Sequence, residues 1–167
     1  MNLVLIGMPA CGKSTIGVIL AKTIGYRFLD TDLVIQELYK TTLEKLIEKQ
    51  GLEGFLLTEE QAVKTIQTDQ CVIATGGSVV YREASMQHLH QNATIIYLKV
   101  GYEEIVSRIQ NIKSRGVVIR EGQTLQELYQ ERESLYLKYA DVVLDVNGLS
   151  MEQIVEVIMK ECKNEKI

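Results

Sequence analysis

Short apolar runs alternate along the chain with longer segments in which apolar residues recur every three or four positions. The short runs are rich in Val, Ile and Leu, as strands buried on both faces of a sheet should be. The longer segments have the period of amphipathic helices, so the alternation predicts a three-layer α/β fold with a parallel sheet flanked by helices. Five strands are expected: Leu3 to Ile6, Phe28 to Leu29 with their flanks, Cys71 to Ala74, Thr94 to Leu98, and Val142 to Val146.

Three of the expected helices begin with a capping pattern, in which a hydroxyl residue stands three positions before Glu or Gln. The pairs are Thr41 with Glu44, Thr124 with Glu127, and Ser150 with Gln153. The last helix has an apolar face, which predicts that it packs against the sheet. That face consists of Met151, Ile154, Val155, Ile158 and Cys162.

Length and composition are those of one folded domain spanning residues 1–167. Hydrophobic residues make up 46% and charged residues 24%, which is ordinary for a globular protein. The net charge is −4 and Lys and Arg are not clustered, so nucleic acid is not an expected partner. No apolar run has the length of a membrane span, and the first strand leads directly into a glycine loop. We therefore expect a cytoplasmic protein that does not bind membranes.

Cysteine and histidine add little chemistry to this picture. The three cysteines, Cys11, Cys71 and Cys162, form no CxxC pair, so we expect free thiols and neither disulfides nor a zinc site. His88 and His90 stand in a polar stretch, where we expect surface side chains.

The segment GMPACGKST places Gly7, four further residues, and then Gly12, Lys13 and Ser14 between a predicted strand and a predicted helix. This is the pattern and the context of a P-loop, which binds the phosphates of ATP or a close relative. Backbone N–H groups and the helix N-terminus surround the anion, Lys13 reaches the β and γ phosphates, and the Ser14 hydroxyl ligates Mg²⁺. The predicted nucleotide-binding residues here are Gly7, Ala10, Cys11, Gly12, Lys13, Ser14 and Thr15.

Two carboxylates, Asp30 and Asp32, end the second predicted strand. They lie at the carboxyl edge of the sheet, where open α/β folds collect ligands. Asp30 or Thr31 can cap the next helix, while Asp32 faces the site and orients or deprotonates an attacking hydroxyl. Ser14, Asp30 and Asp32 are thus the candidate metal-side residues.

The third strand is followed by ATGGSVV, in which Gly76 and Gly77 permit close approach of the backbone to a ligand. A simple turn would also explain them. The strand ends in Ala74 and Thr75 without an acidic residue, so metal binding must depend on Ser14 and Asp32.

Two arginines are candidate anion contacts. Arg132 falls within the apolar stripe of a predicted helix, where a guanidinium needs either an internal carboxylate or a ligand anion. Arg115 lies in the irregular segment 112–123, which is either a mobile lid over the phosphates or a plain surface loop. A lid arginine stabilises a phosphoryl group in transfer.

With GMPACGKST, DTD, TGG, a lid arginine and RESLYLKYAD in this order, the chain resembles the shikimate kinase family over nearly its whole length. The resemblance implies a nucleoside-monophosphate-kinase type fold and transfer of the γ-phosphate of ATP, with Mg²⁺, to the 3-hydroxyl of shikimate, a step of aromatic amino acid biosynthesis. By position, Asp32 then binds the acceptor hydroxyl, Asp30 serves the metal side, and Arg115 contacts the phosphates. Gly76, Gly77 and Arg132 match substrate-side groups, Arg132 being the arginine that grips the substrate carboxylate.

The acceptor half departs from the family pattern. In the family's F-R-x-x-E segment a second arginine helps to grip the carboxylate, but Leu56 stands there in Phe55 to Glu59. Loss of such a contact costs roughly 2–5 kcal/mol. Ser78 replaces the third glycine of GGG, and the usual R-P-L-L reads RGVV from Arg115. Arg82 is a candidate replacement for the lost charge.

The sequence therefore predicts a monomeric small-molecule kinase in which Lys13, Asp32 and Arg115 are catalytic. Shikimate is the leading acceptor, followed by another small hydroxylated metabolite and then by a nucleoside phosphate. A non-catalytic nucleotide-binding regulatory protein is the alternative from a different class. A GTPase is disfavoured because no N-K-x-D motif occurs.

Overall fold

The computed structural model describes residues 1–110 and 119–164, and within them a five-stranded parallel sheet forms the centre. The strands lie in the order β2-β3-β1-β4-β5, and each neighbouring pair is parallel. Their bounds are β1 Asn2–Ile6, β2 Arg27–Asp30, β3 Cys71–Ala74, β4 Ala93–Lys99 and β5 Val142–Asp145. The five predicted strands are confirmed, with boundaries that shift by at most one residue.

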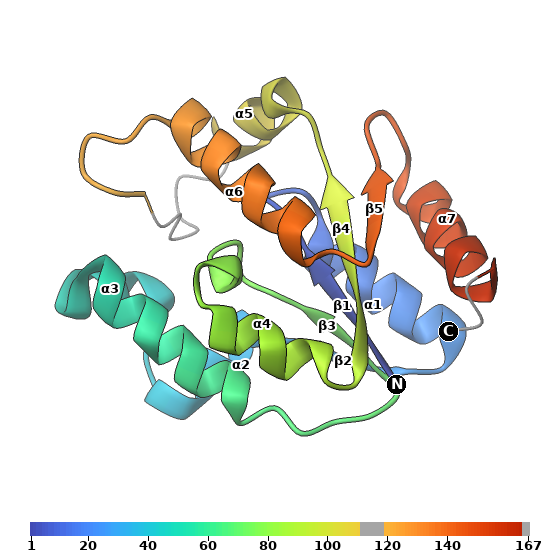
Figure 1. The fold of residues 1–167 in the computed structure, drawn as a ribbon, viewed down its shortest axis with the longest axis horizontal. Coiled ribbons are helices and arrows are strands. Elements are labelled where there is room, and N and C mark those ends of the chain that lie inside the picture. Colours follow the sequence, from blue (N-terminus) through green and yellow to red (C-terminus); the bar gives the residue numbers. More distant parts are fainter. Residues whose placement is uncertain (111–118, 165–167) are drawn as a thin grey trace.

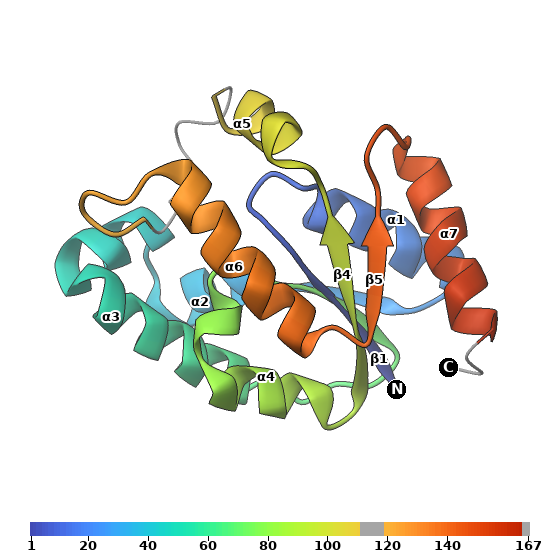
Figure 2. The same cartoon turned by 45° about the horizontal axis from the view of Figure 1, so that its top comes forward.

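Helices cover both faces of the sheet (Figure 1). Helices α1 and α7 lie side by side on one face, and α4 and α6 cover the other, as the turned view in Figure 2 also shows. The helices are α1 Lys13–Ile24, α2 Thr31–Tyr39, α3 Leu43–Lys64, α4 Glu83–His90, α5 Tyr102–Gln110, α6 Leu125–Tyr139 and α7 Met151–Asn164, with a short 3-10 helix η1 at Val79–Tyr81.

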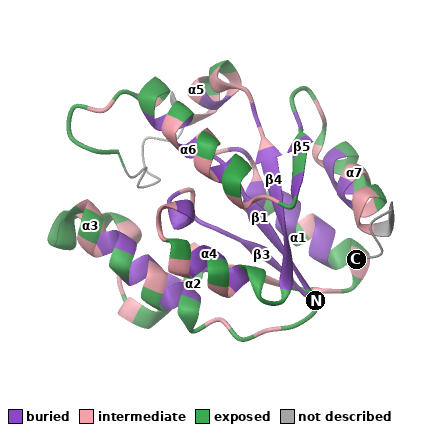
Figure 3. Ribbon diagram, in the orientation of Figure 1, coloured by how far each residue is buried: buried purple, intermediate pink, exposed green. Residues whose placement is uncertain are grey.

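The core follows the sheet, and a smaller apolar cluster lies beside it. Every residue of β1 and β3 is buried, whereas buried and exposed residues alternate along the edge strand β5 (Figure 3). The smaller cluster consists of Ile35, Leu46, Phe55 and Ala62 from α2 and α3. These two helices therefore pack on each other around apolar residues of their own.

The predicted helix starts are confirmed in two cases and wrong in one. Thr124 and Glu127 form the expected capping box, and Ser150 and Gln153 exchange the corresponding hydrogen bonds. In the third case the cap is Thr42, not Thr41, and its hydroxyl accepts from the backbone of Lys45 at 3.4 Å. Thr42 offers the same hydroxyl, and the helix begins one residue later. Glu44 consequently stands too early in the first turn to complete a capping box.

The expectations for the last helix and for the histidines can now be compared with the structure. Ile154, Val155 and Ile158 of α7 are buried, as its apolar pattern predicted. His90 is exposed beside Asp141, whereas His88 is half-buried, with Nε2 2.9 Å from a backbone carbonyl oxygen. Among the helices of the described residues, none is long and apolar enough to cross a membrane.

Candidate active site

The phosphate loop connects β1 to α1 at the carboxyl edge of the sheet. Lys13 is buried, and its Nζ donates to the carbonyl oxygens of Gly7 and Met8, at 2.8 Å each. Gly7 has φ +149°, and a Cβ there would lie 2.8 Å from the carbonyl oxygen of Leu98 in β4. Gly12, which precedes α1, has φ +98°. The two glycines thus permit a tight loop against the central strands.

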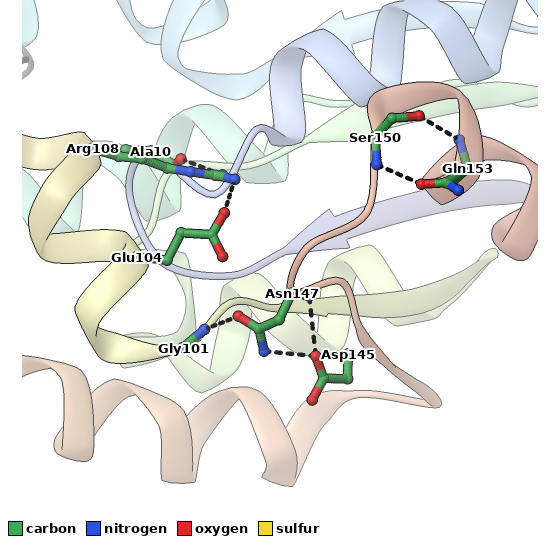
Figure 4. Close-up of polar contacts among 8 residues, drawn as sticks. All are labelled: Ala10, Gly101, Glu104, Arg108, Asp145, Asn147, Ser150 and Gln153. Carbon is green, nitrogen blue, oxygen red and sulfur yellow. Dashed lines mark hydrogen bonds and ion pairs between the residues drawn. The ribbon is translucent and has the colours of Figure 1, made fainter.

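Side chains from α5 and from the loop after β5 link the loops at this edge of the sheet (Figure 4). Arg108 of α5 donates from Nη1 to the carbonyl oxygen of Ala10 at 3.2 Å and forms an ion pair with Glu104. After β5, Asn147 accepts a 2.7 Å hydrogen bond from the backbone N–H of Gly101. Sequence analysis gave Arg108 no role, because nothing in its own helix indicates a contact with residue 10.

Asp30 and Asp32 differ in what they contact. The sequence left open whether Asp30 or Thr31 caps α2. Asp30 caps α2 by accepting from the backbone N–H of Asp32 at 2.9 Å. Its second oxygen accepts from the hydroxyl of Ser14 at 2.6 Å. Asp32 is half-buried and lines the central pocket. The prediction that Asp30 or Thr31 caps the helix is therefore confirmed, with Asp30 as the cap. The role of Asp32 toward an attacking hydroxyl stays a prediction.

A pocket of about 380 Å³ joins the phosphate loop to the acceptor side. The phosphate loop, α2, the turn into α3, the glycine loop after β3, and α6 all contribute to its wall. The lining residues are Pro9, Ala10, Gly12, Lys13, Ser14, Thr15, Asp32, Gln36, Thr42, Leu43, Glu44, Phe55, Thr75, Gly76, Gly77, Ser78 and Arg132. Nine of the predicted site residues line this pocket: Ala10, Gly12, Lys13, Ser14, Thr15, Asp32, Gly76, Gly77 and Arg132. The lining residues from Gln36 to Phe55 were not predicted.

The glycine loop lies against buried carboxylates. Gly76 donates its backbone N–H to the hydroxyl of Thr31 at 3.0 Å. A Cβ on Gly76 would lie 2.7 Å from Glu59 Oε1 and 2.8 Å from Asp32 Oδ1. A larger residue at this position would therefore displace both acidic side chains. Gly76 is thus required by its close approach to two protein side chains. The expected approach of this loop to a ligand stays a prediction.

Arg132 closes the pocket from α6. It is 1% exposed, and its Nε donates to the hydroxyl of Tyr81 at 3.3 Å, with the guanidinium carbon 5.3 Å from the centre of the Tyr81 ring. Burial raises the pKa of Tyr81, so this hydroxyl stays neutral. A Cβ on Gly77 would lie 2.9 Å from Arg132 Nη1, and Tyr136 donates its hydroxyl to the Gly77 carbonyl oxygen at 2.7 Å. Arg132 is held in place from two sides.

Glu59 is the buried acid of the acceptor side, and sequence analysis assigned it no role. It is 1% exposed, and the hydroxyl of Ser78 donates to its Oε2 at 2.8 Å. Burial raises the pKa of Glu59 to about 8; the Ser78 hydrogen bond opposes this shift, the charge of Asp32 adds to it, and Arg132 opposes it. The available signal was the helical spacing of Glu59, which stands three or four residues from Phe55, Leu56, Ala62 and Val63 and so falls within an apolar stripe.

Three further sequence candidates have separate outcomes. Arg82 pairs through Nε with Glu60 Oε2 at 2.6 Å and is not one of the pocket-lining residues above, so its proposed role as the replacement charge gains no support. Leu56 is buried, at 3% exposure. Arg115 and residues 112–118 of the predicted lid lie outside the described residues, and the described Arg120 nearby pairs with Glu131.

Comparison with known proteins decides the family. A family model described as shikimate kinase matches residues 9–163. The chain belongs to the shikimate kinase family. It is 38% identical over 158 residues to a shikimate kinase of Clostridium botulinum (strain Eklund 17B / Type B), with 93% of each chain covered. A shikimate kinase of Thermodesulfovibrio yellowstonii (strain ATCC 51303 / DSM 11347 / YP87) is 35% identical over 163 residues, covering 96% of this chain and 94% of that one.

Solved structures agree on the fold of this family member. A shikimate kinase from Acinetobacter baumannii, in complex with shikimate, aligns with a TM-score of 0.89 at 27% identity, covering 99% of this chain and 94% of that one. The deoxyadenosine kinase from M. mycoides with bound dATP aligns with a TM-score of 0.62 at 20% identity, covering 98% of this chain and 100% of that one. The second likeness concerns the fold alone. The predicted P-loop kinase fold is confirmed.

Proposed function

We propose that this chain transfers the γ-phosphate of ATP to a hydroxyl of shikimate. The observation that carries the proposal is the shared pocket, in which a phosphate-loop lysine, a carboxylate and a buried arginine face one cavity. These three groups are Lys13, Asp32 and Arg132. Family membership supports the reaction type, and the shikimate bound in the Acinetobacter baumannii relative supports the acceptor.

The nucleotide half neutralises and positions phosphate charge. Backbone N–H groups of the loop and the N-terminus of α1 favour an anion. Lys13 Nζ, which donates to Gly7 and Met8, turns toward the β and γ phosphates when they enter, because a phosphate oxygen is the stronger acceptor. In this proposal Arg115 is the further cation on the transferring group.

The residues on the metal side suit Mg²⁺. Among the described residues, no group of three or more His, Cys, Asp and Glu side chains is arranged to hold a metal by itself. Mg²⁺ in kinases is usually held by one or two protein oxygens together with phosphates and waters. The Ser14 hydroxyl and Asp30 Oδ2, 2.6 Å apart, form such a pair, and Asp32 can hold a metal-bound water. The ion would supply charge neutralisation for the phosphates.

The acceptor half orients the nucleophile. Asp32 lines the pocket next to Gly76 and accepts the hydrogen bond of the attacking hydroxyl, which aligns it with the phosphate and takes its proton as the bond forms. Arg132 Nη1 lies beside Gly77 at the far wall, where a guanidinium binds a carboxylate through two parallel hydrogen bonds. The two contacts fix both ends of a small hydroxy acid.

The test is ADP release from Mg-ATP with shikimate and a panel of other hydroxylated metabolites. We expect saturable turnover with shikimate at sub-millimolar concentration, abolished in Lys13→Ala. Turnover with another acceptor and none with shikimate would support a kinase activity and rule out shikimate as its acceptor. ATP binding without any turnover would favour a nucleotide-binding regulatory protein.

A kinase for a different small hydroxy acid is the second candidate. The observation in its favour is Leu56, which is buried where the family pattern has an arginine.

We further propose that residues 1–167 act as one monomeric kinase domain in the cytoplasm. The continuous five-stranded sheet and the single family match over residues 9–163 support the single domain.

A further inference from the structure

Glu59 is a buried carboxyl group that the proposed reaction does not use. Its Oε2 accepts from Ser78, and in the part of the chain that the structure describes its Oε1 has no hydrogen-bond partner. Buried polar atoms are nearly always paired, so a half-paired acid requires an explanation.

The position of Glu59 gives it influence over the acceptor side. Glu59 Oε1 and Asp32 Oδ1 both lie beside Gly76, at 2.7 and 2.8 Å from the position that a Cβ at this glycine would take. Gly76, Asp32 and Ser78 all line the pocket. Glu59 does not line the pocket itself, but it contacts Ser78 and lies beside Gly76, which both do.

Two departures from the family pattern meet at this one carboxyl group. In F-R-x-x-E the arginine stands three residues before the acid, so both lie on the same helix face and are neighbours. Here Leu56 stands at the position of the arginine and offers Glu59 no donor. Both residues are buried in α3. Ser78, where the family has its third glycine, supplies a hydroxyl to the same acid.

Leucine in place of arginine at position 56 also lowers the positive charge available to an acceptor carboxylate. The cationic side chains among the described residues that line the pocket are Lys13, in the phosphate loop, and Arg132, at the acceptor end. Arg82, the candidate replacement named from the sequence, is paired with Glu60. At the described acceptor wall a carboxylate therefore meets one guanidinium instead of two.

We propose that Ser78 is a specificity-determining residue, whose hydroxyl replaces the missing arginine as the donor to Glu59 and leaves Arg132 to hold the single carboxylate of a small hydroxylated acceptor. Ser78 acts through Glu59 and Gly76, and is a positioning residue. The substrate class rests on the proposed function, whereas the pairing of Ser78 with Glu59 does not.

The experiment is a double-mutant cycle of Ser78→Ala and Leu56→Arg, assayed with shikimate and its uncharged methyl ester at saturating Mg-ATP. Leu57→Arg is the matched control, because Leu57 is a 48% exposed neighbour in the same helix. It adds the same charge away from the pocket wall. Melting temperatures of all variants are measured in parallel.

The proposal gives each variant a distinct result. Ser78→Ala alone raises KM for shikimate about fivefold or more with kcat within about twofold, since Glu59 loses its partner. Adding Leu56→Arg restores a partner and a second cation, so KM falls below the wild-type value. The preference for shikimate over its methyl ester then rises about tenfold or more, because a charge-assisted contact is added. Leu57→Arg changes neither quantity.

Two outcomes overturn the proposal: Ser78→Ala with an unchanged KM, or an effect of Leu56→Arg that is equal with and without Ser78. If the wild type shows no turnover of shikimate, the proposed function and the substrate class fail, and melting temperatures decide the pairing. A loss of about 2–4 °C in Ser78→Ala, recovered by Leu56→Arg, supports the pairing. No loss, or a loss without recovery, refutes it.

Discussion

The nucleotide half and the acceptor half of the pocket are built in different ways. The phosphate loop is a continuous stretch, residues 7–15, whose function depends on backbone geometry and on one lysine. The acceptor half is assembled from α2, α3, the glycine loop and α6, which are far apart in the chain. A contiguous site can be recognised by its motif. In an assembled site, a substitution on one element can be offset by a substitution on another, as we propose for Leu56 and Ser78.

The largest predicted effect tests the nucleotide half. Lys13→Ala is expected to lower kcat for ADP release by at least about 10²–10³-fold, because it removes a charge aimed at the transferring phosphate. Lys22→Ala is the matched control, since Lys22 is exposed on the same helix. Lys13 is buried and holds two loop carbonyls, so circular dichroism must show an intact fold. Activity near wild type in a folded variant would remove Lys13 from the mechanism.

The next effect tests Asp32, which could act on the acceptor hydroxyl or on the metal side of the nucleotide. Asp32→Asn is expected to lower kcat about 10²-fold with little change in KM for ATP, because the amide cannot take the proton of the acceptor hydroxyl. Glu37→Gln, an exposed acid on the same helix, serves as control. If KM for ATP rises as steeply as kcat falls, Asp32 belongs to the metal side rather than to the nucleophile.

The third effect tests the acceptor half alone. Arg132→Lys keeps the charge but loses the planar pair of donors, so KM for shikimate should rise about 30-fold or more. KM for ATP should stay within about twofold. Lys138→Arg makes the reverse exchange at an exposed position of the same helix. Equal increases in both KM values would indicate a disturbed pocket instead of a lost carboxylate contact.

The same contrast explains what could be predicted from the sequence. The five strands, the phosphate loop and a cap at Asp30 or Thr31 follow from local patterns, since apolar runs, glycine spacing and a short polar side chain act over a few residues. The burial of Arg132 was visible in its apolar stripe. Glu59 and Arg108 were missed because their partners, Ser78 and Ala10, are 19 and 98 residues away. Such contacts depend on tertiary packing, which periodicity does not encode.

The last predicted effect concerns stability and is specific to the acceptor half. The pKa of Glu59 is raised to about 8 from 4.5, so the folded state binds this proton more tightly than the unfolded chain does. Its contribution to the free energy of unfolding is therefore complete below about pH 4.5 and is lost as the pH rises through 8. The change amounts to a few kcal/mol at most. Urea unfolding at a series of pH values between 5 and 8.5 measures it.

Glu59→Gln isolates this contribution, because the amide is neutral at every pH in the series and nearly the same size. The difference in unfolding free energy between wild type and Glu59→Gln should shift in favour of the variant as the pH rises. Glu53→Gln, exposed on the same helix, should run parallel to the wild type. Parallel curves for all three proteins would mean that Glu59 is already charged at neutral pH. Its negative charge would then lie behind Gly76, where it would oppose an acceptor carboxylate and leave Arg132 with more charge to offset.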